Sequence, residues 1–179
     1  MSKKVLVLSA SPRQGGNSEL LCDQFVLGAQ DAGHETEKVA LRDKKIGYCV
    51  ACEYCQANDG ACAQKDDMAH ILEKMVAADV IVMATPVYFY TMNAQMKTLI
   101  DRTVARYTEI QNKEFYFVVT AADGSKDAME RTLEGFRGFT GCLDGAEEKG
   151  IVYGTGAWRK GEIKGKAAMK QAYDMGKNS

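Results

Sequence analysis

A loop rich in hydrogen-bond donors, residues 9–18, constrains the fold more than any other stretch of this sequence. The run Val-Leu-Val-Leu at 5–8 predicts a strand buried on both faces, and Leu21, Phe25 and Ala29 then recur at helical spacing. A helix that begins after the loop leaves backbone N–H groups unpaired and carries partial positive charge at its start. The loop is therefore expected to bind an anion. Its donors are Ser9, Ser11, Arg13, Asn17 and Ser18.

The alternative for this loop is an ordinary turn from strand to helix, with Asn17 or Ser18 as the helix N-cap. A cap needs one polar residue, whereas the loop supplies six. The Gly-Lys-Ser/Thr ending of a nucleoside-triphosphate loop is missing, and so is the fingerprint of three spaced glycines that binds dinucleotides. A site for one terminal phosphate, held by hydroxyls and amides without a metal, remains.

Charge and length exclude several classes of partner. Lys and Arg number 23 against 24 for Asp and Glu, so no net field attracts nucleic acid or an acidic membrane. No segment has the length of a membrane span, and the opening residues are read as a strand rather than a signal peptide. We expect a soluble, cytoplasmic protein, with one domain over 1–179 and a cysteine-rich loop at about 47–65.

Strand and helix patterns alternate along the rest of the chain. Apolar runs predict strands at 5–8, 35–41, 80–84, 115–119 and 151–153, with Pro86 ending the third. Helical spacing predicts helices after the first loop, from Asp66, and at about 93–106, 126–139 and 166–175. Five strands alternating with five helices indicate an α/β protein with a parallel sheet covered by helices on both faces.

The strand order follows from the loops that are suited to a ligand. In such sheets the ligand lies beyond the carboxyl ends of the strands, where the winding reverses. The loops after the first, third and fourth strands look built for a ligand, and they converge only if those strands are neighbours. This predicts the order 2-1-3-4-5, with the polar second strand at an edge. The expected architecture is thus a flavodoxin-like three-layer sandwich.

The loop after the third strand is aromatic. An exposed aromatic loop is costly unless it packs on something, and a flat ring such as isoalloxazine would fit. The alternative is that these rings fill the seam between the loop and the next helix. Small residues after the fourth strand would let the backbone approach the edge of a planar ligand, although a plain loop is the alternative there too. The candidate ring contacts are Pro86, Val87, Tyr88, Phe89, Tyr90, Ala121, Ala122, Asp123 and Gly124.

Short motifs occur in a particular order along nearly the whole chain. They are Ser-Ala-Ser-Pro-Arg at 9–13, Gly-Asn-Ser at 16–18, Asp-Asp-Met at 66–68, Thr-Pro-Val-Tyr-Phe at 85–89, Met-Lys at 96–97, Asp-Arg at 101–102 and Gly-Ala-Trp at 156–158. With these motifs the chain resembles the NADPH-dependent FMN reductase group of flavoproteins and, within it, the iron–sulfur flavoproteins. The resemblance implies FMN, with its phosphate on the five donors of the first loop and its ring on 86–90 and 121–124. It also implies a homodimer or homotetramer.

Four cysteines are clustered in the segment before the second helix. Their spacing, Cys-x-x-Cys-x-x-Cys followed by a fourth cysteine, can hold one iron–sulfur cubane. The segment resembles the compact motif of the iron–sulfur flavoproteins, which implies a [4Fe–4S] cluster that passes electrons to FMN. Zinc and unmetallated thiols, free or in a labile disulfide, remain alternatives. The candidate ligands are Cys49, Cys52, Cys55 and Cys62, whereas Cys22 and Cys142 are expected to be buried.

No side chain is assigned a catalytic role, because a bound flavin carries the chemistry at its N5 atom. The expected activity is electron transfer from NAD(P)H, or from an iron–sulfur centre or redox protein, to a quinone, a flavin or another small acceptor. One alternative is an electron carrier without a small-molecule substrate of its own. Another is a redox sensor that uses its thiols or a bound metal.

Overall fold

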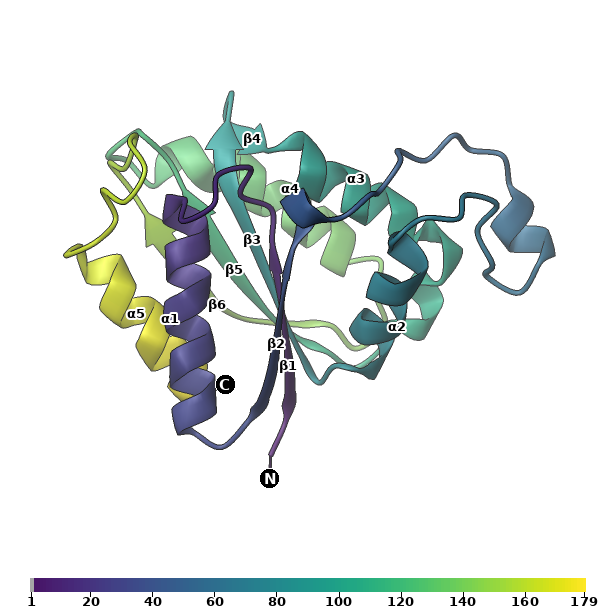
Figure 1. The fold of residues 1–179 in the computed structure, drawn as a ribbon, viewed down its shortest axis with the longest axis horizontal. Helices are drawn as coiled ribbons and strands as arrows, with labels where there is room; N and C mark the ends of the chain where they lie inside the picture. The colour runs from purple at the N-terminus through teal and green to yellow at the C-terminus, as the bar shows by residue number, and fades with distance from the viewer. Residues whose placement is uncertain (1) are drawn as a thin grey trace.

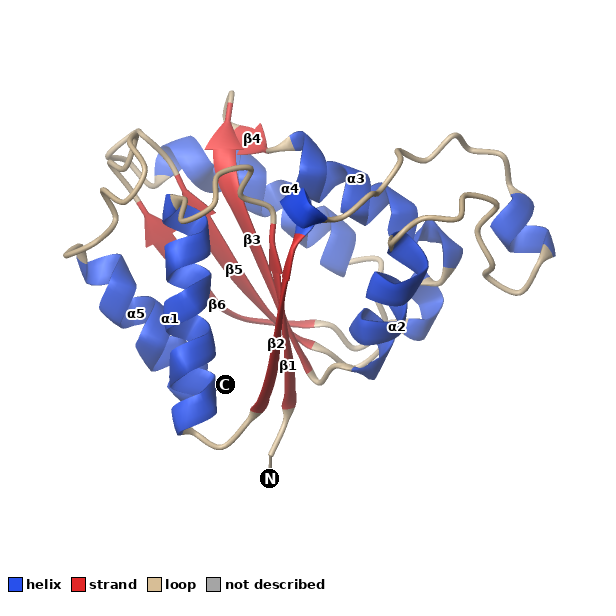
Figure 2. Ribbon diagram, in the orientation of Figure 1, coloured by secondary structure: helices blue, strands red, loops and turns tan. Residues whose placement is uncertain are grey.

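The computed structural model describes residues 2–179 and contains one mixed sheet. Five strands pair in parallel in the order β2-β1-β3-β5-β6, which confirms the predicted order. The sixth strand, β4, was not predicted and pairs antiparallel with the end of β3. Figure 2 shows the strands in red. Their bounds are β1 Lys4–Ser9, β2 Glu35–Ala40, β3 Val80–Tyr88, β4 Thr91–Met92, β5 Glu114–Thr120 and β6 Glu147–Gly154.

Helices cover both faces of the sheet, as expected for a flavodoxin-like sandwich. Helices α1 and α5 lie together on one face, and α2, α3 and α4 lie on the other (Figure 1). Their bounds are α1 Asn17–Asp31, α2 Met68–Ala77, α3 Ala94–Arg102, α4 Glu130–Thr140 and α5 Ala167–Lys177. Short 3₁₀ turns occupy Leu41–Asp43, Tyr54–Ala57, Thr103–Ala105, Tyr107–Glu109 and Asp127–Met129.

The central strands are apolar on both faces because each face packs against helices. Alternate residues of one strand therefore enter different cores. Val5 and Val7 pack with α1 and α5, whereas Leu6 and Leu8 pack with the helices of the other face. All four side chains are buried. Because both of its faces are buried, the sheet forms the middle layer of the fold. The candidate loops emerge at its edge formed by the carboxyl ends of the strands.

The prediction that Pro86 ends the third strand is wrong, because β3 continues to Tyr88. The carbonyl of Ala84 accepts a hydrogen bond from the Ala10 N–H. The backbone groups of Ala84, and of every second residue from it along β3, therefore point toward β1. Strand β1 stops at Ser9, opposite Ala84, and Pro86 lies beyond it while still paired with β5. The missing N–H of proline thus faces the side where no strand needs a donor.

The helix expected at 93–106 is shorter, because regular α3 ends at Arg102 and two 3₁₀ turns follow. Its start is well defined, since the Asn93 side chain accepts a bond from the Met96 N–H. Cys22 is buried, which raises the pKa of its thiol to about 12, whereas Cys142 is exposed, contrary to expectation. Within residues 2–179, every helix is too short or too polar to cross a bilayer.

Candidate functional site

The start of α1 has the unpaired donors that the first loop predicts. Gly16 is the N-cap, and no acceptor within residues 2–179 pairs with the backbone N–H groups of the next three residues. The hydroxyl of Ser18 is buried and has no hydrogen-bond partner among the described residues. An unpaired hydroxyl in the interior is costly. Its position beside free backbone N–H groups therefore indicates a site for a ligand that supplies an acceptor, such as a phosphate oxygen.

Ser11 and Arg13 shape the loop, and Arg13 retains free donors. The Ser11 hydroxyl donates to the Arg13 carbonyl (3.0 Å) and accepts from the Arg13 N–H (3.3 Å). The guanidinium of Arg13 donates to the carbonyl of Trp158 (3.1 Å), which leaves its other N–H groups for a ligand. Ser9 is fully buried in β1 and does not line the cavity described below.

The Asn17 side chain is already satisfied. Its Nδ2 donates to the carbonyls of Ala157 (3.1 Å) and Arg159 (2.9 Å). Its Oδ1 accepts from the N–H groups of Gly161 (3.0 Å) and Ile163 (3.3 Å). The Asn17 side chain therefore joins the loop after β6 to the start of α1. Only the backbone N–H of Asn17 remains free to bind an anion.

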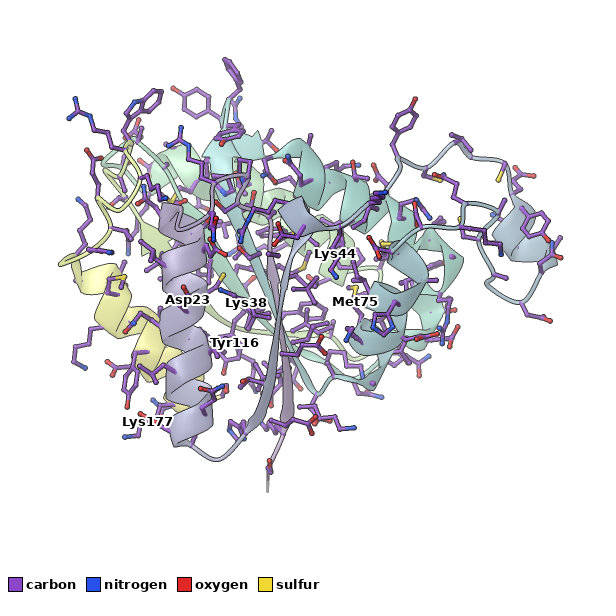
Figure 3. All side chains as sticks on the ribbon, viewed as in Figure 1. Asp23, Lys38, Lys44, Met75, Tyr116 and Lys177 are labelled. Atoms are coloured by element: carbon purple, nitrogen blue, oxygen red, sulfur yellow. The ribbon has the colours of Figure 1, made fainter. Side chains whose placement is uncertain are left out.

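Glu19 is a site residue that the sequence patterns did not reveal. Its carboxylate accepts from the Gly15 N–H (2.6 Å) and from Arg42 (2.8 Å), and Lys38 lies 3.6 Å away. Burial by itself would raise the pKa of Glu19, but the bonds from Arg42 and Gly15 outweigh burial and lower it. Lys38 also pairs with Asp23, which Figure 3 shows beside it. The negative charge at this loop is thus compensated before any ligand binds.

The loop after β3 is a tight hairpin tip rather than an extended loop. Tyr88 pairs with Thr91, so Phe89 and Tyr90 are the two central residues, and both have positive φ (50° and 65°). This conformation suits a type I′ turn, in which Asn-Gly is preferred and bulky side chains are strained. Phe89 is 99% exposed. The tip therefore holds an aromatic ring in solvent at a cost in backbone strain, which is typical of a functional segment.

Asn93 joins this hairpin to the first loop. Its Nδ2 donates to the carbonyl of Ala10 (2.5 Å), and its backbone N–H donates to the Thr85 hydroxyl (3.1 Å). The side chains of Asn93 and Thr85 are both buried. This network brings the loops after β1 and β3 together, as the predicted strand order requires.

One cavity of about 340 Å³ joins the three loops. Most of the predicted residues line it, while Ser9, Tyr90, Asp123 and Gly124 do not. Tyr90 and Asp123 instead line a neighbouring hollow with Arg131. The lining consists of Ser11, Arg13, Gly16, Asn17, Ser18, Pro86, Val87, Tyr88, Phe89, Thr120, Ala121, Ala122, Ala157 and Trp158.

Of these lining residues, Gly16, Thr120, Ala157 and Trp158 were not predicted as contacts. The loop after β6 reaches the cavity because the Ala157 N–H donates to the Ala121 carbonyl (2.9 Å). The Trp158 ring is 72% exposed at the rim. The carboxyl ends of parallel strands share one edge, so this loop, which follows the last strand, could have been inferred from the topology.

The cysteine segment forms a second cavity, which shares no lining residue with the first. It projects beyond α2 and α3, at the right of Figure 1. Cys49, Cys52, Cys55 and Cys62 are free thiols that line a common cavity of about 420 Å³. Within residues 2–179, no three His, Cys, Asp or Glu side chains are grouped closely enough to hold a single metal ion.

Arg102, at the end of α3, anchors this segment. Its guanidinium, 2% exposed, forms a bidentate pair with Asp66 (2.7 and 3.0 Å) and donates to the Gly47 carbonyl (2.6 Å). It also donates to the sulfur of Cys62 (3.4 Å). Burial of the Asp66 carboxyl would raise its pKa, but the bonds from Arg102 and two backbone N–H groups lower it. Asp101 does not pair with Arg102 but with Lys97 (2.5 Å).

Solved structures with a similar fold belong to the flavodoxin-like class. An FMN-dependent NADH-azoreductase from Bacillus anthracis, solved in complex with FMN, superposes with a TM-score of 0.75 over 99% of both chains, at 17% identity. This likeness defines the fold. A family model, NADPH-dependent FMN reductase, matches residues 3–145. The chain belongs to this family, which confirms the resemblance predicted from its motifs.

Among curated proteins, the chain is similar to two archaeal iron–sulfur flavoproteins. It is 39% identical over 99 residues to one from Archaeoglobus fulgidus, which covers 55% of this chain and 44% of that protein. It is 41% identical over 133 residues to one from Methanosarcina thermophila, which covers 73% of this chain and 69% of that protein. In the first of these alignments the chain thus spans less than half of the relative's length.

Proposed function

We propose that this protein is an FMN-dependent oxidoreductase that transfers electrons from NAD(P)H to a small acceptor such as a quinone or a free flavin. The observation that carries the proposal is the cavity between the loops after β1, β3, β5 and β6. One end of the cavity offers free helix N–H groups and an unpaired buried hydroxyl, and the other offers apolar and aromatic side chains. A phosphate attached to a planar ring matches both ends.

The residues of the cavity have separate tasks in this proposal. The Ser18 hydroxyl, the free N–H groups of Arg13 and the first N–H groups of α1 hold the phosphate of FMN, and Ser11 lines the same part of the cavity. Pro86 to Phe89 and the backbone at Ala121 and Ala122 hold the ring and shield one face of it. The bound flavin supplies the electron transfer at N5, so no protein nucleophile or base is required. Tyr88 and Phe89 form a wall for the acceptor.

We further propose a homodimer or homotetramer in which a neighbouring subunit helps to cover the flavin. Phe89 and Trp158 lie at the cavity and are strongly exposed in the single chain. Large exposed aromatic side chains at a site are typical of surfaces that are covered in the functional state.

A [4Fe–4S] cluster bound by the four clustered cysteines is a second proposed cofactor. Four thiols line one cavity. In a cubane each thiolate binds a different iron, and Cys-x-x-Cys-x-x-Cys with a fourth cysteine nearby suits this arrangement better than the two separated Cys-x-x-Cys pairs of a structural zinc site. Arg102 also lines this cavity, and its buried Nε has no partner among the described residues. The names of the archaeal relatives favour the same cofactor.

The flavin proposal is tested by titrating flavin-free protein with FMN and following the quenching of flavin fluorescence. Ser18→Ala should weaken FMN binding about 10- to 150-fold, because a hydrogen bond to a charged group contributes about 1.5–3 kcal/mol. Ser2→Ala is the matched control, since the Ser2 hydroxyl bonds to Gly33 at the opposite end of β1. A protein that fails to take up FMN would overturn the flavin site.

The electron donor is tested on the FMN-bound protein by following the oxidation of NADPH and NADH in the presence of a quinone or free flavin. We expect rapid oxidation that depends on bound FMN. Bound FMN without NAD(P)H oxidation would favour an electron carrier instead. Absence of flavin together with reactive thiols would favour the redox sensor.

A further inference from the structure

Arg102 is a buried cation with more contacts than its ion pair needs. Both terminal nitrogens bond to Asp66, and this bidentate pair balances the charge. The same nitrogens also bond to the Gly47 carbonyl, to Gln64 Oε1 (3.3 Å) and to Cys62 Sγ. A purely structural ion pair does not require a cysteine sulfur as a partner, so this additional contact calls for a role.

The contacts of Arg102 connect the two ends of the cysteine segment. Gly47 precedes the first cysteine, Cys62 is the last one, and Asp66 begins the approach to α2. Arg102 itself belongs to α3, which packs in the core through Met96 and Leu99. A helix fixed in the core thus positions both ends of an otherwise exposed loop. Arg102 closes the loop together with the bond from the Gly47 N–H to Asp66 and the bond from the Gln64 amide to the Tyr48 carbonyl.

The unsatisfied donor of Arg102 is the second observation. Its Nε is buried and finds no acceptor within the described residues, although a buried donor is normally paired. Arg102 lines the same cavity as the four cysteines. An anionic, sulfur-rich group in that cavity would supply the kind of acceptor that the guanidinium lacks.

We propose that Arg102 is a positioning residue of the cysteine site, which holds Cys62 in place and raises the reduction potential of the cluster bound there. The inference rests on the proposed cluster and goes beyond the four ligands. One-electron reduction adds one negative charge to the cluster and breaks no bond. A cation that donates a hydrogen bond to a ligand sulfur stabilises the more negative state and therefore makes reduction easier.

The test compares Arg102→Gln and Arg102→Lys with the unmodified full chain, each loaded with FMN and reconstituted anaerobically with iron and sulfide. Iron per chain is measured, and the cluster is titrated with dithionite in the presence of redox mediators while its electron paramagnetic resonance signal is followed. In Arg102→Gln we expect about tenfold less reduced cluster at a given potential, which for one electron is a shift of about 59 mV to lower potential. Arg102→Lys keeps the charge and should recover part of the shift.

Arg106→Gln is the matched control. Arg106 is near the segment, pairs with Glu109 (2.8 and 2.7 Å) and does not line the cysteine cavity. Its removal should leave the potential and the iron content unchanged. If Arg102→Gln cannot retain iron, recovery of iron in Arg102→Lys, with FMN still bound in both variants, supports the positioning role.

Two results would overturn the inference. The first is an Arg102→Gln variant with unchanged iron content and an unchanged potential. The second is an unmodified chain that takes up no cluster at all, in which case FMN binding and NADPH oxidation still decide the flavin proposal separately. Conversely, a chain that holds the cluster with an Arg102-dependent potential but binds no FMN supports this inference while the flavin proposal fails.

Discussion

Asn17→Ala separates a structural role of this residue from the ligand role that the sequence predicted. The side chain makes four hydrogen bonds to the loop after β6, and two of them, to Ala157 and Ile163, are fully buried. Each intramolecular hydrogen bond contributes about 1 kcal/mol net, and groups near the surface can bond to water instead. The buried pair alone is thus worth about 2 kcal/mol. With the two partly buried bonds, we expect a loss of about 2–4 kcal/mol in the free energy of unfolding.

The assay is urea unfolding of the flavin-free protein, followed by far-UV circular dichroism, so that no ligand contributes to stability. Ser18→Ala is the matched control on the same turn. Its hydroxyl is buried and has no partner in the described chain, so its loss should not destabilise the flavin-free protein but raise its free energy of unfolding by about 1–3 kcal/mol. If Asn17→Ala left that stability unchanged and weakened only FMN binding, Asn17 would be a phosphate ligand and its structural role would be refuted.

Three further predictions concern the same site. In Gly16→Ala the added carbon would lie 2.9 Å from the carbonyl oxygen of Arg13, so the loop must shift and FMN affinity should fall at least about tenfold in a fluorescence titration. Glu19→Gln should destabilise the protein at neutral pH. The lowered pKa of Glu19 means that its contribution is complete above 4.5 and lost as pH falls through the folded value, so unfolding curves of variant and unmodified chain should converge in acid. The double variant Phe89→Asn with Tyr90→Gly should stabilise the flavin-free protein by about 1–2 kcal/mol in thermal unfolding, because it relieves two positive φ angles, while weakening FMN binding. An unchanged midpoint would show that the tip is not strained.

The pattern of the chain determined the sheet and its order. Apolar runs such as 80–84 and 115–119 are buried on both faces, and this requirement leaves a parallel sheet between two helix layers as the solution. The donors at Ser11 and Ser18 and the aromatic stretch after β3 were also readable, because binding residues concentrate in the loops that a rigid scaffold positions. Residues distant in sequence could be expected to meet because carboxyl strand ends share an edge.

Only the tertiary structure decided how individual polar side chains are used. Asn17 has the chemistry of a ligand, but its amide is satisfied by a loop about 140 residues further on. Arg102 follows Asp101 directly in the sequence, yet its partners are Asp66 and Cys62. The sequence shows which donors and acceptors exist, whereas their pairing depends on which backbone groups the fold brings within about 3 Å. The spacing of apolar residues indicates which side chains are buried, and this burial defines the layers of the fold. Hydrogen-bond partners depend instead on packing between segments that are distant in sequence, which no local pattern contains.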